Sequence, residues 1–427
     1  MEAIFINPPR EQWPALVKRP AFDYASLEAI IAPILADVKA SGDTAVRKYA
    51  AQFDKAALTE LMVSASEVEE ALPLVSDDLK AAIQLAKNNI QRFHESQKET
   101  VQKITTTDGV LCWRKSVAIQ KVGLYIPGGT APLFSTLLML GIPAQIAGCS
   151  QVVMCTPSNA DGKVNPVILY TAQLLGISNI FKVGGVQAIA AMAYGTETVP
   201  GVSKIFGPGN QYVTAAKQLV NREGIAIDMP AGPSELAVYA DETAIPAFVA
   251  SDLLSQAEHG PDSQVLLVAS SKTILEAVKE EVDLQLAALP RKDVATLALQ
   301  HSRLIVLEDS QTAFEFLNEY AAEHFIIASE DAVSLSEKVI NAGSVFLGNY
   351  SPESAGDYAS GTNHTLPTNG FAKAYSGVSV DSFVKKITYQ QLSKEGIRNI
   401  GPSVELMAEA EGLQAHKNAI TLRLQSL

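Results

Sequence analysis

The chain has 427 residues and a net charge of -13, with 47% hydrophobic and 19% charged residues. This length exceeds the size at which single cores stop growing, so at least two packed units are predicted, and the composition is typical of a globular rather than a disordered protein. The negative charge argues against nucleic acid and anionic membranes as partners, because such a surface would repel both.

The amino terminus, MEAIFINPPREQWPAL, lacks the basic region and long apolar run of a secretory signal, so a cytoplasmic protein is expected. The first hundred residues are predicted to be helical. A helix over SLEAIIAPILADVKASG is expected to end at Gly42, with Asp43 capping the next helix and Ser76 capping the long one after it. The apolar window APLFSTLLMLGIPAQIAGC contains Pro132 and Pro143, which favours a buried helix over a membrane span.

From about Val117 the pattern changes to short β-branched runs that alternate with helices. The first series of predicted strands is KVGLYI, QVVMCTP, NIFKVGG and SKIFGPG, and Asn165 and Pro166 begin one of the intervening helices. The second series is ELAVYA, QVLLVAS, RLIVL, FIIAS and SVFLG. This alternation predicts an α/β fold with two units built on parallel sheets, followed by a helical carboxyl-terminal piece.

Three glycine-bearing turns follow predicted strands, in VGLYIPGGTAP, KVGGVQAIAA and KIFGPGNQYV. In the last of these Gly207 and Gly209 allow close approach to a phosphate, but the third glycine of a dinucleotide fingerprint falls at Tyr212. Each turn alone is equally consistent with a tight connection. Three at the carboxyl ends of parallel strands indicate an edge where α/β sheets bind ligands.

The six histidines divide into two groups. His94 and His301 lie among polar residues and are expected to be solvated without a role. His324 follows Glu323 at the start of a strand, where one side chain could take a proton and the other orient water, although a solvated acid–imidazole pair fits equally. Another histidine, His364, shares with Asp357 a Gly- and Ser-rich loop that is too long for a simple turn.

A metal site is one interpretation of SDLLSQAEHGPDSQ. Gln256 and His259 stand three residues apart, so they project from one face of a helix, although the stretch is also an ordinary helix end before Gly and Pro. With Asp357 and His416 they offer two nitrogen and two oxygen donors, a set that suits zinc, cobalt or manganese better than magnesium or copper. Glu411 and His416 are either surface groups on a terminal helix or part of a lid.

Long, unusual strings along almost the whole chain resemble the histidinol dehydrogenase family. They include GLYIPGGTAPLFST, IDMPAGPSE, DLLSQAEHGPDSQV, AGSVFLGNYSPESAGDYASGTNH and AHKNAITLR. The resemblance implies two incomplete Rossmann-like domains, an N-terminal helical arm, a small C-terminal helical domain and a homodimer with intertwined ends. The implied boundaries are 1–20 for the arm, 21–124 and 236–378 for the first α/β domain, 125–235 for the NAD-binding domain, and 379–427 for the swapped domain.

The resemblance also implies a role for particular residues. The family's zinc ligands match Gln256, His259, Asp357 and His416; the general base matches His324, and the water-activating acid matches Glu323. The implied substrate contacts are these six residues together with Ser234, His364 and Glu411, and the implied NAD contacts are Tyr125, Gln187 and Asn210. Ala322 departs from the proline expected before the Glu-His pair, which removes no functional group.

The implied reaction oxidises L-histidinol through L-histidinal to L-histidine with two NAD, on a zinc that orients the substrate.

Two alternative functions are suggested by other features of the sequence. Cys112 and Cys155 raise the possibility of a metal-independent aldehyde dehydrogenase with a thiol nucleophile, although neither has a neighbouring base in the sequence. A non-catalytic metal- or nucleotide-binding regulator on the same fold would be expected to lack some of the donors.

Overall fold

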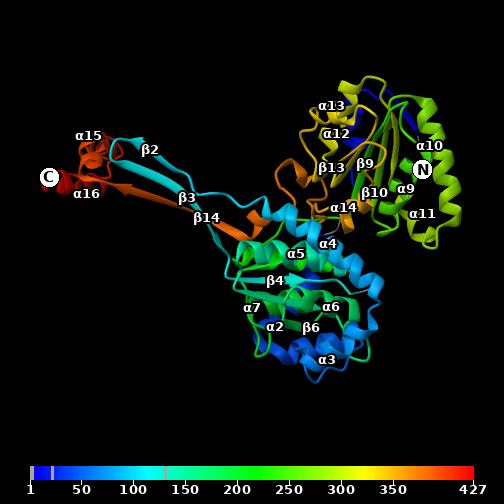
Figure 1. The fold of residues 1–427 in the computed structure, drawn as a ribbon, viewed down its shortest axis with the longest axis horizontal. Helices are drawn as coiled ribbons and strands as arrows, with labels where there is room; N and C mark the ends of the chain where they lie inside the picture. Colours follow the sequence, from blue (N-terminus) through cyan, green and yellow to red (C-terminus); the bar gives the residue numbers. More distant parts are fainter. Residues whose placement is uncertain (1–3, 21–23, 129–131) are drawn as a thin grey trace.

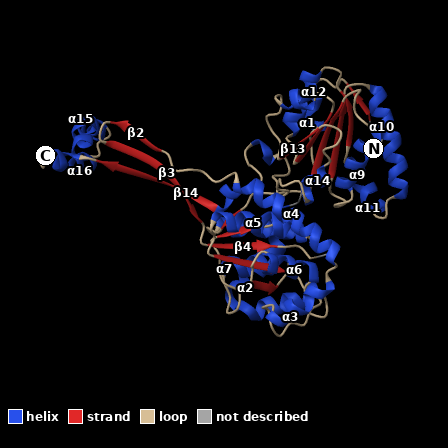
Figure 2. Ribbon diagram, in the orientation of Figure 1, coloured by secondary structure: helices blue, strands red, loops and turns tan. Residues whose placement is uncertain are grey.

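The computed structural model describes residues 4–20, 24–128 and 132–427 and consists of two α/β lobes and a long arm that ends at the carboxyl terminus (Figure 1). Each lobe is built on one parallel sheet, and the arm carries an antiparallel sheet. Helices flank both parallel sheets, whereas most of the arm is strand without flanking helices (Figure 2). Within the described ranges, no helix is long and apolar enough to cross a membrane.

The six-stranded lobe combines the start of the chain with residues 235–358. Its elements are β1 (Ile4–Ile6), α1 (Trp13–Leu16), β9 (Glu235–Ala240), α9 (Pro246–Ala257), β10 (Gln264–Ala269), α10 (Lys272–Ala288), α11 (Lys292–Gln300), β11 (Arg303–Val306), α12 (Ser310–Tyr320), β12 (His324–Ala328), α13 (Ala332–Ser336), β13 (Ser344–Leu347) and α14 (Glu353–Tyr358). The strand order is β1-β11-β10-β9-β12-β13, all parallel. Successive residues of a strand face opposite ways, so Val238 packs under α9, α10 and α11 while Tyr239 packs under α1 and α12.

The start of the chain differs from the predicted helical arm. Residues 4–6 form the edge strand β1, whose Ile4 and Ile6 stand opposite Leu304 and Val306 of β11. A three-residue strand is too short to show a period of two, so the sequence did not reveal it. The described part of residues 1–20 is therefore integral to the six-stranded lobe.

The five-stranded lobe holds the first series of predicted strands. Its elements are α2 (Tyr24–Tyr49), α3 (Ala65–Ala71), α4 (Asp77–Glu95), β4 (Lys121–Tyr125), α5 (Phe134–Ala147), β5 (Gln151–Thr156), α6 (Pro166–Leu174), β6 (Asn179–Lys182), α7 (Gly185–Tyr194), β7 (Lys204–Phe206), α8 (Gln211–Arg222) and β8 (Ala226–Ile227). The strand order is β6-β5-β4-β7-β8, again parallel. All nine strands predicted in the two series are confirmed, and α5 is the predicted buried apolar helix.

The helix signals of the sequence were mostly correct. Ser76 accepts a hydrogen bond from the Leu79 amide at the start of α4, and Asn165 accepts one from Val167 at the start of α6, where Pro166 takes the first position. Gly42 interrupts α2 with a φ of 52°. The cap expected from Asp43 was wrong, because its carboxylate accepts hydrogen bonds from the loop at residues 196–198 instead.

The domain division predicted for residues 21–124 was wrong. α2 packs against α7 and α8, α3 against α6, and α4 against α5, so these helices cover the five-stranded sheet rather than the sheet of residues 236–378. The sequence of an amphipathic helix shows which face is apolar but does not show which sheet that face covers. The amino-terminal helices therefore complete the lobe that follows them in the chain.

The arm was not predicted. It consists of β2 (Lys103–Thr107), β3 (Val110–Ala118) and β14 (Val384–Leu392), followed by α15 (Lys394–Ala410) and α16 (Gln414–Gln425). β14 pairs with β3 in antiparallel register over nine residues, so the carboxyl-terminal piece 379–427 is not purely helical. Most residues of β14 are exposed or half-exposed, which leaves no alternation of buried and exposed positions for a pattern to show. At the base of the arm, Phe383 stacks on Phe206 of the five-stranded lobe with ring centroids 4.0 Å apart.

A buried ion pair holds the glycine-bearing turn after β7. The Lys217 ammonium contacts the Asp228 carboxylate, and the two side chains are 5% and 2% exposed. Lys217 donates to the Gly207 carbonyl at 2.8 Å, and Asp228 accepts from the Gly207 amide at the same distance. Gly207 has a φ of 131°, and an added side chain would collide with the Tyr125 carbonyl. The pair therefore fixes both backbone groups of a residue that must be glycine.

We expect Lys217→Met to leave the Asp228 carboxylate buried without its partner and to destabilise the five-stranded lobe by about 3 to 5 kcal/mol. Urea unfolding followed by fluorescence and circular dichroism measures the loss. The control is Lys272→Met, which removes an exposed partner of Glu276 and should change stability by less than about 1 kcal/mol. Equal effects of the two substitutions would contradict the role assigned to the buried pair.

Candidate active site

An acid–imidazole pair lies at the amino end of β12. Residues Glu323 and His324 are both buried, and His324 stands opposite Leu236 of β9 and Ser344 of β13. The Glu323 carboxylate accepts a hydrogen bond from the Glu235 amide at 3.0 Å, and its oxygen lies 3.8 Å from His324 Nδ1. The alternative of a solvated surface pair is therefore wrong.

Two further carboxylates surround His324. Glu353 lies 3.6 Å from Nδ1, and Asp357 lies 3.5 Å from Nε2. Burial alone would lower the pKa of His324, but attraction to Glu353, Glu323 and Asp357 outweighs it and raises the pKa to about 10. Burial raises the pKa values of Glu323 and Glu353 to about 8 each. The cluster thus holds protons that solvent-exposed acids would have lost at neutral pH.

Glu353 was missed by the sequence analysis, although a signal was present. It stands four residues before Asp357, and this spacing places both carboxylates on one face of α14. The side chain is 1% exposed, and one of its oxygens has no hydrogen-bond partner within the described residues. A carboxylate so deeply buried beside His324 belongs to the site.

The end of α9 supplies a possible metal site. Gln256 lies in the last turn of the helix, and its Nε2 is 3.2 Å from Nδ1 of His259. Ligand atoms of His259, Glu353 and Asp357 all lie within 4.8 Å of one another. The Gln256 side chain is fully buried, yet its Oε1 atom has no hydrogen-bond partner in the part of the chain that is described. Three of the four predicted ligands therefore converge, in a donor set of mixed nitrogen and oxygen atoms.

The fourth predicted ligand is elsewhere. His416 lies on α16 at the far end of the arm, and Glu411 lies between α15 and α16 (Figure 1). Both side chains are exposed. Within one chain these two residues do not reach the cluster around His324, whereas the imidazole of His259 keeps an exposed side.

The loop after α14 connects the cluster to the other lobe. The Nδ1–H group of His364 donates to the Asp357 carbonyl at 2.9 Å, and its Nε2 lies 3.0 Å from the Thr136 hydroxyl of α5. Beside it, Asn363 donates to the Met139 carbonyl and contacts His94. His94 is fully buried, and burial lowers its pKa, so the expectation that it is solvated was wrong.

The predicted cofactor residues lie at the carboxyl edge of the five-stranded sheet. Tyr125 ends β4, and its hydroxyl accepts a hydrogen bond from the Gly185 amide at 3.1 Å. Gln187 is fully buried in the first turn of α7, and the exposed Asn210 caps α8 through the amides of Tyr212 and Val213. The glycine-bearing turn after β4 is described only up to Gly128, because residues 129–131 lie outside the described ranges. The three predicted contacts therefore come from turns that share one edge of a sheet.

The two groups of residues use opposite kinds of sheet edge. In the six-stranded lobe, Ser234, Glu323 and His324 lie at the amino ends of β9 and β12, whereas Tyr125 and the glycine-bearing turns follow the carboxyl ends of their strands. The contact between His364 and Thr136 joins the two groups. A buried acid–imidazole cluster in one lobe, joined to a second lobe whose glycine-bearing turns share one sheet edge, is typical of a two-lobed α/β enzyme for a small molecule.

Comparisons with known proteins specify the family. The family model of histidinol dehydrogenase matches residues 17–424. Histidinol dehydrogenase of Bacteroides thetaiotaomicron is 59% identical over 420 residues, covering 98% of both chains, and that of Escherichia coli is 52% identical, covering 98% of this chain and 96% of its own. The crystal structure of histidinol dehydrogenase from Elizabethkingia anophelis has 57% identity and a TM-score of 0.97, covering 99% of this chain and 98% of that one. The chain belongs to the histidinol dehydrogenase family and is an oxidoreductase of histidine biosynthesis.

Asp54 next to Gln187 is expected to make stability depend on pH. Burial raises the pKa of Asp54 to about 6, although the Gly184 amide opposes the shift. Because the folded state binds this proton more tightly, the stabilising contribution is complete below about pH 4 and is lost as the pH rises through about 6.

Asp54→Asn should therefore raise the free energy of unfolding by about 1 kcal/mol at pH 7.5, allowing for partial screening by solvent, and the gain should disappear near pH 4. Thermal unfolding across this range measures it, with the exposed Asp161→Asn as a matched control. A gain that is the same at both pH values would show that Asp54 does not titrate as described.

Proposed function

We propose that the chain oxidises L-histidinol through L-histidinal to L-histidine with two NAD per histidinol, as the last step of histidine biosynthesis. Family membership supports the substrate. The observation that carries the mechanism is the burial of Glu323 and His324 beside Asp357 and the end of α9. The proposed location is the cytoplasm.

Zinc is the proposed metal. Gln256, His259, Asp357 and His416 would hold it, and their amide, imidazole and carboxylate donors are of the intermediate hardness that zinc accepts. The orphaned Oε1 atom of Gln256 supports this assignment, because a fully buried amide oxygen needs a partner. When bound, the metal supplies a charge that orients the imidazole and amine nitrogens of the substrate.

His324 is the proposed general base for the substrate hydroxyl. Both of its ring nitrogens lie within 4 Å of a carboxylate, and these carboxylates stabilise the imidazolium that proton removal produces. Neutralisation of the Asp357 charge by a ligated cation would reduce the attraction that raises the pKa of His324. The unprotonated imidazole that a base requires would then be more populated at neutral pH.

Glu323 is proposed to direct water onto the aldehyde. Its carboxylate accepts a hydrogen bond from the Glu235 amide and lies near Nδ1 of His324, whereas Asp357 lies near Nε2. Glu323 and the proposed zinc ligand Asp357 would therefore approach the substrate from different sides of His324. Ser234, next to Glu235 in sequence, and His364, beside Thr136, are the proposed substrate contacts from this chain. The buried aldehyde would thereby be hydrated without being released.

Tyr125, Gln187 and Asn210 are the proposed NAD contacts. NAD, when bound, accepts a hydride in each of the two oxidations. The Asn210 side-chain oxygen accepts hydrogen bonds from backbone amides at the start of α8. Asn210 therefore caps the amino terminus of a helix whose dipole favours anionic groups. Gly207, held by Lys217 and Asp228, keeps the neighbouring backbone free of a side chain.

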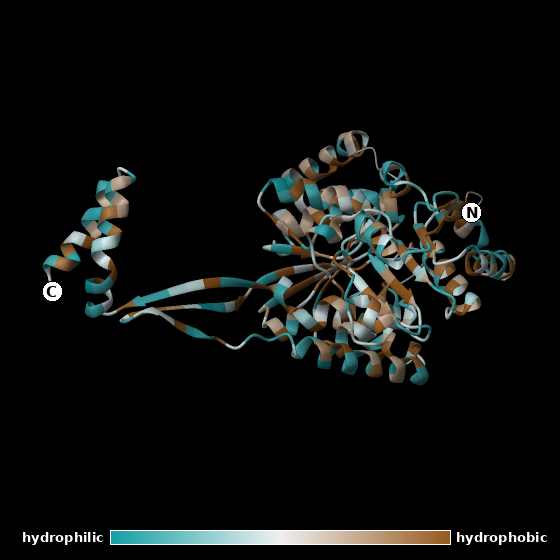
Figure 3. Ribbon diagram, turned by 90° about the horizontal axis from the view of Figure 1, so that it is seen from above, coloured by the Kyte–Doolittle hydropathy of each residue, from teal (hydrophilic) through white to brown (hydrophobic). Residues whose placement is uncertain are grey.

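The proposed assembly is a homodimer in which the arm of one chain completes the site of the other. His416 and Glu411 lie far from their own chain's cluster, and the helices that carry them expose Leu406, Met407 and Leu422 by 58% or more. Figure 3 shows these helices separated from both lobes, with hydrophobic residues along them. Burial of those side chains against a second copy would place His416 in reach of another chain.

A thiol-dependent aldehyde dehydrogenase is a weaker explanation. Burial raises the pKa of Cys149 to about 11 and that of Cys155 further, so neither thiol is an effective nucleophile. Cys112 lies on β3 of the arm, paired across from Gln390 and Ile104. A non-catalytic regulator is also disfavoured, because the donors and the acid–imidazole pair are all present in the sequence.

The proposed reaction should yield two NADH per L-histidinol consumed. Removal of zinc with a chelator should abolish turnover without loss of helical circular dichroism, because the two lobes have extensive cores of their own. Zinc content should return to one per subunit with activity on readdition. Absence of turnover with zinc restored would refute the function, and unfolding on chelation would make the metal structural.

Mixed dimers test the shared site. Inactive Gln256→Ala and His416→Asn variants, unfolded together and refolded as a mixture, should regain on the order of a quarter of wild-type activity, because random pairing makes about half of the dimers mixed and each mixed dimer has one intact site. Each variant refolded alone is the control. An inactive mixture in which mass spectrometry detects mixed dimers would mean that all ligands come from one chain.

A further inference from the structure

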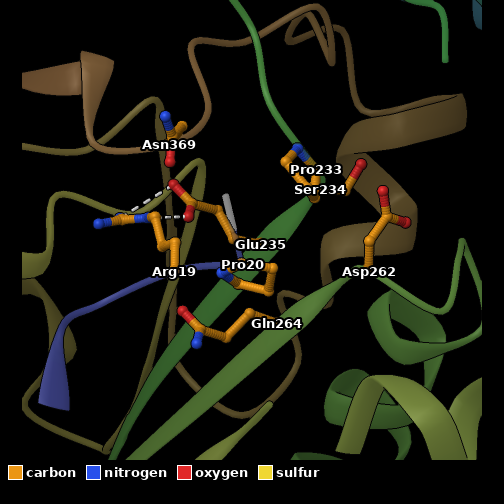
Figure 4. A pocket seen from close by; sticks show the side chains of 8 residues that line it. All are labelled: Arg19, Pro20, Pro233, Ser234, Glu235, Asp262, Gln264 and Asn369. Atoms are coloured by element: carbon orange, nitrogen blue, oxygen red, sulfur yellow. Dashed lines mark hydrogen bonds and ion pairs between the residues drawn. The ribbon is translucent and has the colours of Figure 1, made fainter. Parts of the chain in front are cut away.

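A second charged cluster lies directly behind Glu323. Arg19, Glu235 and Gln264 line a small pocket with Ser234 (Figure 4). The side chains of Arg19 and Glu235 are 12% and 2% exposed, so this is a buried ion pair. Among the interactions of the described residues, this pair has none with the proposed zinc ligands or with the predicted NAD residues.

The Arg19 guanidinium joins several segments at once. Its Nε and Nη2 atoms donate to the two carboxylate oxygens of Glu235, the latter at 3.0 Å. Nη2 also donates to the carbonyls of Tyr320 and Ala321, and Cζ lies 3.9 Å from the centre of the Tyr320 ring. A planar fork is suited to such simultaneous contacts, whereas an ammonium is not.

These contacts act on the backbone that leads to the acid–imidazole pair. Ala321 has a φ of 54°, a left-handed conformation that costs an alanine about 1 kcal/mol and persists only where surroundings enforce it. Arg19 binds the carbonyl of this residue and of the one before it, two and three positions upstream of Glu323. The turn that sets the direction of Glu323 is thus held by a side chain from the start of the chain.

The same ion pair acts on Glu323 by a second route. Glu235 accepts from Arg19 with its side chain and donates its own amide to Oε2 of Glu323 at 3.0 Å. Its Oε1 also accepts from the Gly370 amide at 3.4 Å, which ties the position of Glu235 to the loop after the site. Movement of Glu235 would therefore displace the hydrogen bond that orients the Glu323 carboxylate.

We propose that Arg19 is a positioning residue that aims the Glu323 carboxylate through the Ala321 turn and the Glu235 amide. The proposal rests on the proposed function, in which Glu323 activates water for the second oxidation. Buried ion pairs add little net stability over a neutral pair of similar volume, so stability alone is a poor reason for this arrangement. Precise placement of a catalytic group by supporting contacts is a better one.

The test uses Arg19→Met/Glu235→Gln, which leaves no unpaired charge and keeps an amide oxygen that can accept from Gly370. The full-length zinc enzyme is assayed for oxidation of L-histidinal with NAD, with and without Glu323→Gln. The matched control is Arg10→Met/Glu315→Gln, an ion pair from the same segment that is 67% and 37% exposed.

We expect kcat for L-histidinal to fall about tenfold with KM changed less than about twofold, because misplacement of a reacting group costs rate rather than binding. In the Glu323→Gln background the same double change should cause no further loss, since the residue being aimed is already disabled. The control pair should leave both constants unchanged. The proposal would be overturned if the double change lowered kcat by the same factor with and without Glu323→Gln, or if it changed only KM.

Arg19→Lys provides a second variant if the double change impairs folding. It keeps the buried charge but loses the fork, so we expect near-normal thermal stability with kcat for L-histidinal reduced about threefold. Unchanged kcat would overturn the proposal. A wild-type enzyme that fails to oxidise L-histidinal would instead refute the proposed function, and an unaffected Glu323→Gln enzyme would refute the role of Glu323.

Discussion

The interaction on which the rest of the structure depends is the burial of one imidazole among three carboxylates. His324 lies within 4 Å of Glu323, Glu353 and Asp357, and all four groups are largely withdrawn from water. Such a cluster is unfavourable unless its charges are reduced or compensated. Burial raises the pKa of Glu353, and the surrounding carboxylates overcome burial to raise the pKa of His324, so both shifts reduce the net negative charge of the cluster. It also requires rigid support. The residues come from β12 and α14, and both elements are fixed by apolar cores on the two faces of the six-stranded sheet.

The cluster lies at an unusual edge of its sheet. Parallel strands commonly present ligand sites at their carboxyl ends, where loops are free to vary. Here the proposed NAD contacts of the five-stranded lobe follow that rule, whereas the proposed substrate contacts of the six-stranded lobe lie at the amino ends of β9 and β12. Two lobes that each offer one edge need a bridge, and the loop with Asn363 and His364 provides it through Met139 and Thr136. The lobe with the proposed substrate contacts and the lobe with the proposed NAD contacts are thereby linked by a few hydrogen bonds.

The extent to which the sequence predicts the structure depends on whether the signal is local. Short apolar, β-branched runs that alternate with helices predicted all nine strands of the two series, and single side chains such as Ser76 and Asn165 predicted helix starts. Contacts between distant segments were not predictable in this way. Helices α2 to α4 were assigned to the wrong lobe, Asp43 was expected to cap its own helix, and His94 was expected to be solvated.

The candidate site shows the same limit. The spacing predicted that Gln256 and His259 share a helix face, but α9 ends at Ala257 and His259 lies just beyond it. The structure still brings the two side chains together and places Asp357 beside them, a convergence that spacing alone does not contain. The spacing of Glu353 to Asp357 indicates that the two share a helix face, but nothing in the sequence distinguishes Glu353 from an acidic residue on the surface. Arg19 carried no signal at all, since its partners lie about 200 to 300 residues away in the chain and its role depends on the left-handed turn at Ala321.

The helices at the end of the arm carry both exposed apolar side chains and the proposed zinc ligand His416. Helix α15 packs on α16 and on the end of the antiparallel sheet, so the two helices lack the layered core that stabilises the lobes. Their exposed leucines and Met407 are costly in water, and that cost is removed only where another surface covers them. In the proposed dimer the covering surface belongs to the second copy, and the same docking carries His416 toward an imidazole at His259 that is open on one side. An unpaired chain would then be deficient twice, in an uncovered apolar surface and in an incomplete ligand set, and a single association event would correct both.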